Sequence, residues 1–272
     1  MYGPNLPENR RGILMAFLQG NGPRIIAHRG LSLGHVENTI GSFRAALKAG
    51  ADILETDIHL SKDGVAIAAH DPDLKRLCGD NSRIADLTEK QLAAINLGSG
   101  EGLPSLRALL EEFPTSRFNV DLKTPEVVGA FAKAVRSQNA EQRVLAASFN
   151  GHTRAKAVEL IPGIASSASR KMVLDARLKS LIGLPPASWS IPPEIVAMQI
   201  PPFAFGLALA TPQMIDFAHR KGVEIHIWTI NRISEIRELI LLGIDGIVTD
   251  RADLAYKVKT DLKAEGHHSQ KN

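Results

Sequence analysis

Short apolar runs alternate with longer amphipathic stretches along almost the whole chain. The short runs favour strands, whereas the longer stretches repeat apolar residues every three or four positions, and several end at a glycine. Repeated βα units of this kind form parallel strands. The eight predicted strands cover residues 24–30, 52–60, 117–123, 143–148, 163–169, 194–200, 223–230 and 246–250. Eight units favour a closed (β/α)8 TIM barrel over an open doubly wound sheet, particularly because no Gly-x-Gly-x-x-Gly turn follows the first strand.

One interval interrupts the alternation. After the second predicted strand, residues 62–64 form a turn signal, residues 65–71 a further strand, and residues 72–104 a polar stretch with no clean βα unit. We expect a small insertion there, beside the rim of the barrel that βα loops build. The predicted organisation is an N-terminal segment (residues 1–23), a barrel (residues 24–263) and a flexible polar tail (residues 264–272).

Composition and charge narrow the possible functions. The formal net charge is +3 and the basic residues are spread along the chain, so no nucleic-acid partner is predicted. The apolar run at residues 13–18 is too short for a membrane span and lacks a small-residue cleavage site, so we interpret it as a packed segment without stable membrane insertion. The single cysteine, Cys78, excludes an intrachain disulfide and suits a reducing compartment, which predicts the cytoplasm. The oligomeric state stays open.

Acidic side chains share one face of two neighbouring predicted strands. Because side chains alternate along a strand, Glu55 and Asp57 point to the face opposite the apolar residues, and Asp121 does the same on the next strand. Carboxylates that converge in this way repel one another unless a cation neutralises them, and an all-oxygen ligand set suits Mg²⁺ or Ca²⁺. The alternative is ordinary pairing with nearby Arg or Lys side chains.

Two histidines stand at the ends of apolar runs, His28 in "AHRG" and His70 in "AAHD". Either could be a structural residue, but together beside a cation they offer a proton acceptor and a proton donor near neutral pH. Arg29 and Lys123 add fixed positive charge suited to the oxygens of a phosphate group. We therefore predict that an anion binds at these strand ends, with Glu37 completing the site from the following loop.

Several separate motifs, in order, resemble the glycerophosphodiester phosphodiesterase family. They are "AHRG…ENT", "GADILETDIHLSKDGVAIAAHDPDLKR", "GLPSLRALLEEF", "FNVDLK", "HIWTIN" and "GIDGIVTDR", spanning residues 24–253. The resemblance implies a TIM barrel with a small insertion after the second strand, one divalent metal, and hydrolysis of glycerophosphodiesters to sn-glycerol 3-phosphate and an alcohol.

The resemblance also implies roles for single residues. His28 and His70 would be the acid–base pair, with Glu55, Asp57 and Asp121 as metal ligands and Arg29 and Lys123 as phosphate contacts, while Glu37 would support the substrate-binding site. Trp228 matches the seventh-strand motif and could form a wall of the pocket, and Gln199, at the end of the sixth strand, could bind substrate; packing and loop contacts are the alternatives. Many members carry Glu where this chain has Asp121, so the identity of the metal, Mg²⁺ or Ca²⁺, stays open.

Three other functions compete with hydrolysis of small glycerophosphodiesters. The same barrel could release headgroups from lysophospholipids or sphingolipids, a lysophospholipase D-like or sphingomyelinase D-like activity. Phe203 and Phe205 favour that reading, but the sequence offers no amphipathic membrane helix, so it ranks second. A non-catalytic binder would be expected to lack a histidine or a carboxylate, and a metal-free phospholipase C-like barrel would not need three converging acids.

Overall fold

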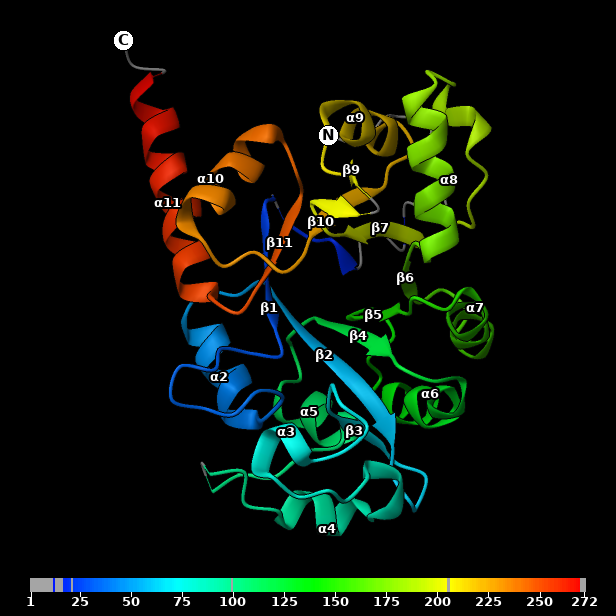
Figure 1. The fold of residues 1–272 in the computed structure, drawn as a ribbon, viewed down its shortest axis with the longest axis vertical. Coiled ribbons are helices and arrows are strands. Elements are labelled where there is room, and N and C mark those ends of the chain that lie inside the picture. Colours follow the sequence, from blue (N-terminus) through cyan, green and yellow to red (C-terminus); the bar gives the residue numbers. More distant parts are fainter. Residues whose placement is uncertain (1–11, 13–16, 21, 99, 205, 270–272) are drawn as a thin grey trace.

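The structure, a computed structural model, describes residues 12, 17–20, 22–98, 100–204 and 206–269. Parallel strands form a closed barrel in which β1 pairs with both β11 and β2 (Figure 1). The barrel strands are β1 (Arg24–His28), β2 (Ile53–Leu60), β4 (Phe118–Leu122), β5 (Val144–Ala147), β6 (Ala165–Ser167), β7 (Ile195–Ile200), β10 (Glu224–Ile227) and β11 (Gly246–Thr249). Each lies within one of the eight predicted strands, so the predicted (β/α)8 barrel is confirmed.

Helices surround the barrel, and the apolar faces of both layers meet between them (Figure 1). They are α2 (Ile40–Lys48), α5 (Leu106–Glu112), η2 (Pro125–Val127), α6 (Val128–Ser137), α7 (Gly151–Leu160), α8 (Arg170–Leu181), η3 (Pro186–Ser188), α9 (Pro212–His219), α10 (Ile233–Leu242) and α11 (Ala252–Ser269). A short hairpin of β8 (Phe203–Ala204) and β9 (Leu207–Ala208) stands between β7 and α9.

Strand alternation separates two apolar layers. Leu54 and Ile58 of β2 pack with Phe118 of β4 in the large core between the barrel and the helices. Ile26 and Ile53 belong to a second cluster, and since their neighbours in sequence face the helices, this cluster fills the inside of the barrel. Leu54 and Ile58 face the outer layer, so Glu55 and Asp57, which alternate with them, project inward as predicted.

The amino-terminal end of the barrel is plugged. Phe17 and Leu18 are buried in the inner cluster, in agreement with a packed segment at residues 13–18, of which 13–16 lie outside the described residues. The guanidinium of Arg24 donates two hydrogen bonds of 2.8 Å to the carboxylate of Glu224. It also donates to the carbonyl oxygens of Leu18 and Gln19. The buried ion pair therefore ties the plug to two barrel strands.

The insertion after β2 folds against the barrel rim and has a small core of its own. β3 (Ala66–Ala68) pairs antiparallel with the end of β2, and α3 (Lys75–Cys78), η1 (Ile84–Asp86) and α4 (Glu89–Ala94) follow. Its apolar residues form a separate cluster that includes Leu74, Ile84 and Leu92. The hydrogen bond from the amide of Ala69 to the carbonyl of Asp57, 2.9 Å, turns the chain back so that the residue after it, His70, reaches the barrel mouth.

The carboxyl-terminal helix is longer than the sequence indicates. We expected an aperiodic tail from residue 264, but α11 continues to Ser269. Its apolar spacing ends earlier, at Leu262, which packs against the core. Backbone hydrogen bonds therefore extend the helix beyond the part that packing explains.

We expect Arg24→Met to lower the free energy of unfolding by about 3–5 kcal/mol, because it leaves a buried carboxylate without its guanidinium partner. The measurement is urea denaturation. The matched control is Arg107→Met, which removes an exposed ion pair with Glu111 and should cost less than about 1 kcal/mol. If Arg24→Met lowered the free energy of unfolding no more than Arg107→Met does, the contact of Arg24 with Glu224 and the plug would not stabilise the barrel.

Candidate active site

A cavity of about 590 Å³ opens at the carboxyl ends of the barrel strands. One side is polar and comes mainly from β1, β2, β4 and the insertion. The other side is apolar and comes from the later strands, α8 and the β8–β9 hairpin. The polar side includes His28, Arg29, Glu55, Asp57, His70, Asn119, Asp121, Lys123 and Gln199, and the apolar side includes Phe149, Val173, Leu174, Ile200, Pro201, Ala204, Leu209 and Trp228. The site therefore suits a molecule with one charged end and one less polar end.

Strand register brings the acidic residues together. His28 pairs with Glu55 between β1 and β2, and Asp57 pairs with Asp121 between β2 and β4. All three carboxylates are buried. Two neighbouring parallel strands, β2 and β4, thus hold three acids in one small volume beside His28 of β1, as the sequence predicted.

Arg29 and Lys123 supply the positive charge that faces these acids. The ammonium of Lys123 lies 2.5 Å from Asp57 and 2.9 Å from Asp121, and the guanidinium of Arg29 lies 3.1 Å from Asp57. The backbone amide of Arg29 donates to the Glu55 carboxylate, 3.1 Å. Among the described residues, no three His, Cys, Asp or Glu side chains are arranged to hold a metal ion, since Lys123 lies between the two aspartates.

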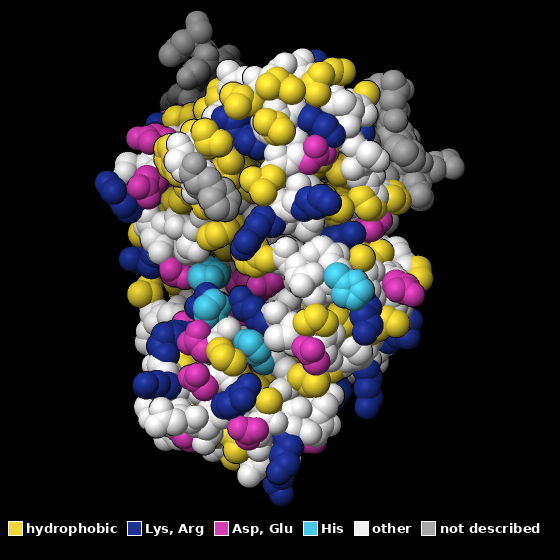
Figure 2. Space-filling view, turned by 45° about the vertical axis from the view of Figure 1, so that its right-hand side comes forward, with side chains coloured by type: hydrophobic (Ala, Val, Ile, Leu, Met, Phe, Trp, Pro, Cys, Tyr) yellow, Lys and Arg dark blue, Asp and Glu magenta, His cyan; other side chains and the backbone are white. Residues whose placement is uncertain are grey.

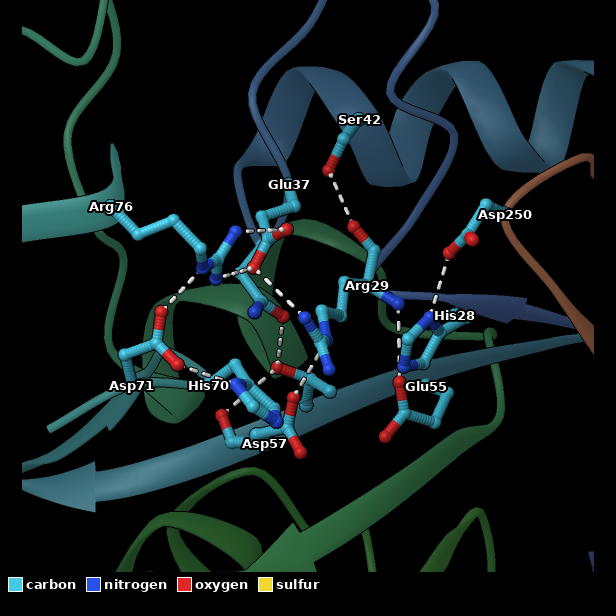
Figure 3. A network of polar contacts seen from close by, with 12 residues as sticks. His28, Arg29, Glu37, Ser42, Glu55, Asp57, His70, Asp71, Arg76 and Asp250 are labelled. Atoms are coloured by element: carbon cyan, nitrogen blue, oxygen red, sulfur yellow. Dashed lines mark hydrogen bonds and ion pairs between the residues drawn. The ribbon is translucent and has the colours of Figure 1, made fainter. Parts of the chain in front are cut away.

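The Arg29 backbone adopts an unusual conformation to reach this position. Its φ is +56°, and the next residue, Gly30, has φ +88°. A Cβ atom at residue 30 would lie 2.4 Å from the hydroxyl oxygen of Ser42 in α2, so only glycine fits there. Ser42 in turn donates to the backbone carbonyl of Arg29, 3.2 Å (Figure 3). The start of α2 therefore sets where the arginine points.

Burial sets the charge balance inside the cavity. Burial and the nearby charge of Asp57 raise the pKa of Glu55 to about 8. Burial also raises the pKa of Asp121, although Lys123 opposes the effect. Burial favours the neutral amine of Lys123, but the two aspartates outweigh it and raise its pKa. Near neutral pH Glu55 therefore holds a proton, and the two aspartates face the two cations Arg29 and Lys123.

His28 is held by a carboxylate from the last strand. Its Nδ1 lies 2.7 Å from Asp250, which also accepts a 2.7 Å hydrogen bond from the amide of Asn231 (Figure 3 shows the His28 contact). Burial acts to lower the pKa of His28, but the hydrogen bond to Asp250 and the charge of Glu55 outweigh it, so the pKa is raised. The protonated imidazole is therefore favoured at this position.

His70 has an equivalent partner on the other side of the site. Its Nδ1 lies 2.7 Å from Asp71, whose second oxygen accepts a hydrogen bond from Arg76 of α3. Arg76 also donates to Glu37 at 2.6 and 3.0 Å (Figure 3). In this view Arg29 lies between the two histidines. Each imidazole is thus oriented through Nδ1, which leaves Nε2 for chemistry.

Nine of the ten residues expected to form the site line the cavity, and Glu37 is the exception. Its carboxylate accepts hydrogen bonds from Arg29 and Arg76, which outweigh burial and lower its pKa. Glu37 was predicted among the substrate-binding residues, but both its oxygens are occupied and its negative charge would repel a phosphate group. It instead positions Arg29.

Gln199 and Trp228 both line the cavity, as expected. The amide nitrogen of Gln199 is buried and has no hydrogen-bond partner among the described residues. Trp228 packs edge to face against Phe149, with ring centroids 6.0 Å apart, at the boundary between the polar and apolar sides. Gln199 thus offers a free hydrogen-bond donor to a bound molecule, and Trp228 forms part of the cavity wall.

Sequence analysis missed three residues that orient the histidines: Asp250, Asp71 and Arg76. Asp250 follows β11, and barrel closure places β11 beside β1, so its position at the end of the last strand was a usable signal. Asp71 directly follows His70. Arg76 lies in the insertion, where no periodicity relates it to the barrel.

The fold and the site together define a class: a (β/α)8 barrel whose mouth holds two histidines, three acidic residues and two basic residues around one cavity. Residues 28–254 match the model of the glycerophosphoryl diester phosphodiesterase family. The chain belongs to this family and is a phosphoric diester hydrolase.

Three similar proteins illustrate the relationship. The chain is 31% identical over 240 residues to probable glycerophosphodiester phosphodiesterase 2 of Mycobacterium tuberculosis, covering 88% of this chain and 91% of that protein. It is 26% identical over 258 residues to human lysophospholipase D GDPD1, covering 83% and 82%. A phosphodiesterase of Oleispira antarctica, solved with the product sn-glycerol-3-phosphate, shares the fold with a TM-score of 0.70 at 23% identity, covering 88% and 97%. Within the described part of the chain, no helix combines the length and apolarity needed to cross a membrane.

We expect Asp250→Asn to lower the pKa of His28, because the variant removes the carboxylate that favours the protonated ring. NMR titration of the imidazole measures the shift, and proton loss should move to lower pH. Asp253→Asn is the matched control, since Asp253 pairs with Arg251 instead. An unchanged titration of His28 in Asp250→Asn would contradict the assigned role of Asp250.

Proposed function

We propose that the cavity hydrolyses glycerophosphodiesters to glycerol 3-phosphate and an alcohol. The observation that carries the proposal is the pair of carboxylate-bound histidines, His28 and His70, on either side of the Arg29 guanidinium. Cleavage of a phosphodiester needs a base for the nucleophile, an acid for the leaving alcohol, and positive charge for the phosphoryl oxygens. The site offers all three.

The environments of the two histidines suggest which is the acid. The raised pKa of His28 favours its protonated form, so we assign it to donate a proton to the departing alcohol. His70 then acts as the base through Nε2, with Asp71 holding Nδ1. Arg29 and Lys123 stabilise the charge on the phosphoryl oxygens.

The glycerol part of the substrate can supply the nucleophile. Its 2-hydroxyl group is already tethered near phosphorus, and such proximity is worth many orders of magnitude in effective concentration. We propose that His70 removes the proton of this hydroxyl, which attacks phosphorus and gives a cyclic glycerol phosphate. Water then opens the ring, with the proton roles of the two histidines reversed.

A divalent cation fits the donor set of the site. Glu55, Asp57 and Asp121 would hold it, because three buried carboxylates are hard oxygen ligands of the kind that Mg²⁺ and Ca²⁺ take. Near neutral pH, where Glu55 holds a proton, the two cations balance the two aspartates, and a divalent cation would favour the ionised form of Glu55 by displacing that proton. The buried Oδ2 of Asp57 lies 3.1 Å from Nε of Arg29 but accepts no well-directed hydrogen bond within the described chain. Binding of the cation requires Lys123 to give up at least one carboxylate contact.

When bound, such a cation supplies Lewis-acid polarisation of the phosphoryl group and lowers the pKa of a nearby hydroxyl group. The side chain of Asp121 is shorter than the Glu that many family members carry there, so a binding measurement is needed to decide between Mg²⁺ and Ca²⁺. Cytoplasmic location remains a prediction.

A lysophospholipid is the second candidate substrate, and the apolar side of the cavity favours it. Phe149, Leu174 and Leu209 line the apolar side, where the acyl chain carried by the glycerol part of a lysophospholipid would lie. The human relative named lysophospholipase D supports the same reading. In both reactions the phosphate occupies the polar side, so the two candidates differ only in what the apolar side holds.

A substrate panel tests the proposal. Phosphorus NMR should detect glycerol 3-phosphate from glycerophosphocholine, -ethanolamine, -glycerol or -inositol, whereas lysophosphatidylcholine should yield a lysophosphatidate if the second candidate is correct. Stripping with EDTA should abolish turnover, and Mg²⁺ or Ca²⁺ should restore it. A 2-deoxy analogue should bind but resist cleavage.

Each part of the proposal has its own contrary outcome. Full activity after metal removal would contradict the cation, and normal cleavage of the 2-deoxy analogue would contradict attack by the glycerol hydroxyl. Absence of release from every substrate, by a folded protein supplied with metal, would contradict the proposed function.

We expect His28→Ala and His70→Ala each to lower kcat by at least about 10²-fold. A substrate with a nitrophenolate leaving group, which departs without protonation, should rescue His28→Ala but not His70→Ala. The matched control is His152→Ala, an exposed histidine in the first turn of α7, which should keep normal rates. Rescue of the opposite variant would reverse the acid and base assignments.

A further inference from the structure

An apolar patch lies on the surface beside the cavity mouth. Leu174, Leu178 and Leu181 are spaced along one exposed stripe of α8, and Phe203 and Leu207 stand on the β8–β9 hairpin. We call these five residues the leucine patch. Phe203 is 71% exposed and Leu178 is 60% exposed. Figure 2 shows hydrophobic side chains gathered above the histidines, interspersed with Lys and Arg. Apolar groups that cluster on a surface usually mark an interaction site.

The leucine patch is continuous with the apolar side of the cavity. Leu174 belongs to both, and Ala204 of the hairpin also lines the cavity. The guanidinium of Arg177 in α8 donates a 3.0 Å hydrogen bond to the carbonyl of Ala208, which joins the helix to the hairpin. An apolar chain can therefore pass from the cavity to the outer surface without crossing a polar barrier.

The charge around the patch is positive. α8 carries four basic residues, Arg170, Lys171, Arg177 and Lys179, against one acidic residue, Asp175. Arg170 and Lys171 are exposed in the first turn, and Arg170 lies over the ring of Phe149 at 5.9 Å. A surface that joins exposed leucines and a phenylalanine to basic side chains matches the chemistry of an anionic lipid interface.

We propose that the leucine patch docks the enzyme onto an anionic lipid surface, with the cavity mouth facing the headgroups. Leu178, Leu181 and Phe203 enter the interface, while Lys171 contacts lipid phosphates. The docking is peripheral, because it uses side chains on the surface of α8 and the β8–β9 hairpin. It goes beyond the proposed reaction, and it deepens the second candidate substrate because it presents the cavity to amphiphiles.

A second copy of the chain is a poorer occupant. In a twofold dimer the same patch lies on both subunits, so residues at the edge of one patch approach residues at the edge of the other. The basic residues of α8 would then meet like charges, whereas anionic lipid neutralises them. Charge complementarity thus favours lipid.

Vesicle flotation tests the proposal without turnover. The probes are vesicles of phosphatidylcholine alone and vesicles of equal parts phosphatidylcholine and phosphatidylglycerol. The full chain should bind the anionic vesicles, and added salt should weaken binding. The double variant Leu178→Ser with Phe203→Ser should bind at least about tenfold less tightly, since each side chain transfers apolar area into the interface. Lys171→Glu should weaken binding to anionic vesicles only.

A matched variant and a separate assay complete the design. Leu241→Ser removes an equally exposed leucine, 67% exposed, from α10, and it should leave vesicle binding unchanged. The double variant should hydrolyse glycerophosphocholine at the normal rate, because neither Leu178 nor Phe203 lines the cavity. If the unmodified chain did not hydrolyse glycerophosphocholine, the proposed function would be contradicted. Vesicle binding does not depend on that activity, so it tests the docking proposal separately.

Three outcomes would overturn the docking proposal. The full chain could fail to bind either vesicle, or the double variant could bind as tightly as the full chain. Light scattering could also show a dimer that the double variant abolishes, without vesicle binding, which would assign the patch to self-association.

Discussion

Arg29 and Lys123 hold three buried carboxylates together at the mouth of a closed barrel, and the rest of the site depends on this balance. Without the two cations, Glu55, Asp57 and Asp121 would repel one another across adjacent strands that cannot separate, because the barrel leaves them no free edge. The strands hold the carboxylates at fixed positions, and the two cations lower the electrostatic cost of keeping them close together. Burial and Asp57 together raise the pKa of Glu55 to about 8, so one of the three acids holds a proton near neutral pH.

The sequence was sufficient to predict the features that follow from local periodicity. The alternation of apolar runs and helical stretches located all eight barrel strands, and the period of two along β2 and β4 put Glu55, Asp57 and Asp121 on one face. Parallel strands end at the same rim, so His28 and the acids could be placed together before the structure was available. This reasoning works because barrel geometry converts position in a strand directly into position in space.

Features that depend on which surface is covered could not be predicted in the same way. The leucines of α8 look like core residues in the sequence, and we expected no amphipathic membrane helix. Only the packing of α8 shows that Val173 and Ala176 face inward while Leu178 faces solvent. The contact between Arg76 and Glu37 joins the insertion to the first loop across 39 residues of chain. Phe205, which we had grouped with Phe203, lies outside the described residues.

The division of the cavity into a polar side and an apolar side has a consequence for how the enzyme can diversify. Most of the groups that handle phosphate lie before residue 124, whereas the apolar wall comes from residues 147–228. Because α8 and the hairpin supply none of the acids or histidines, substitutions there change the apolar wall without replacing a polar group of the site. Such a layout is modular: the apolar wall can be altered for a new substrate while the strands and loops that carry the polar groups, including Asp250 after β11, keep their residues.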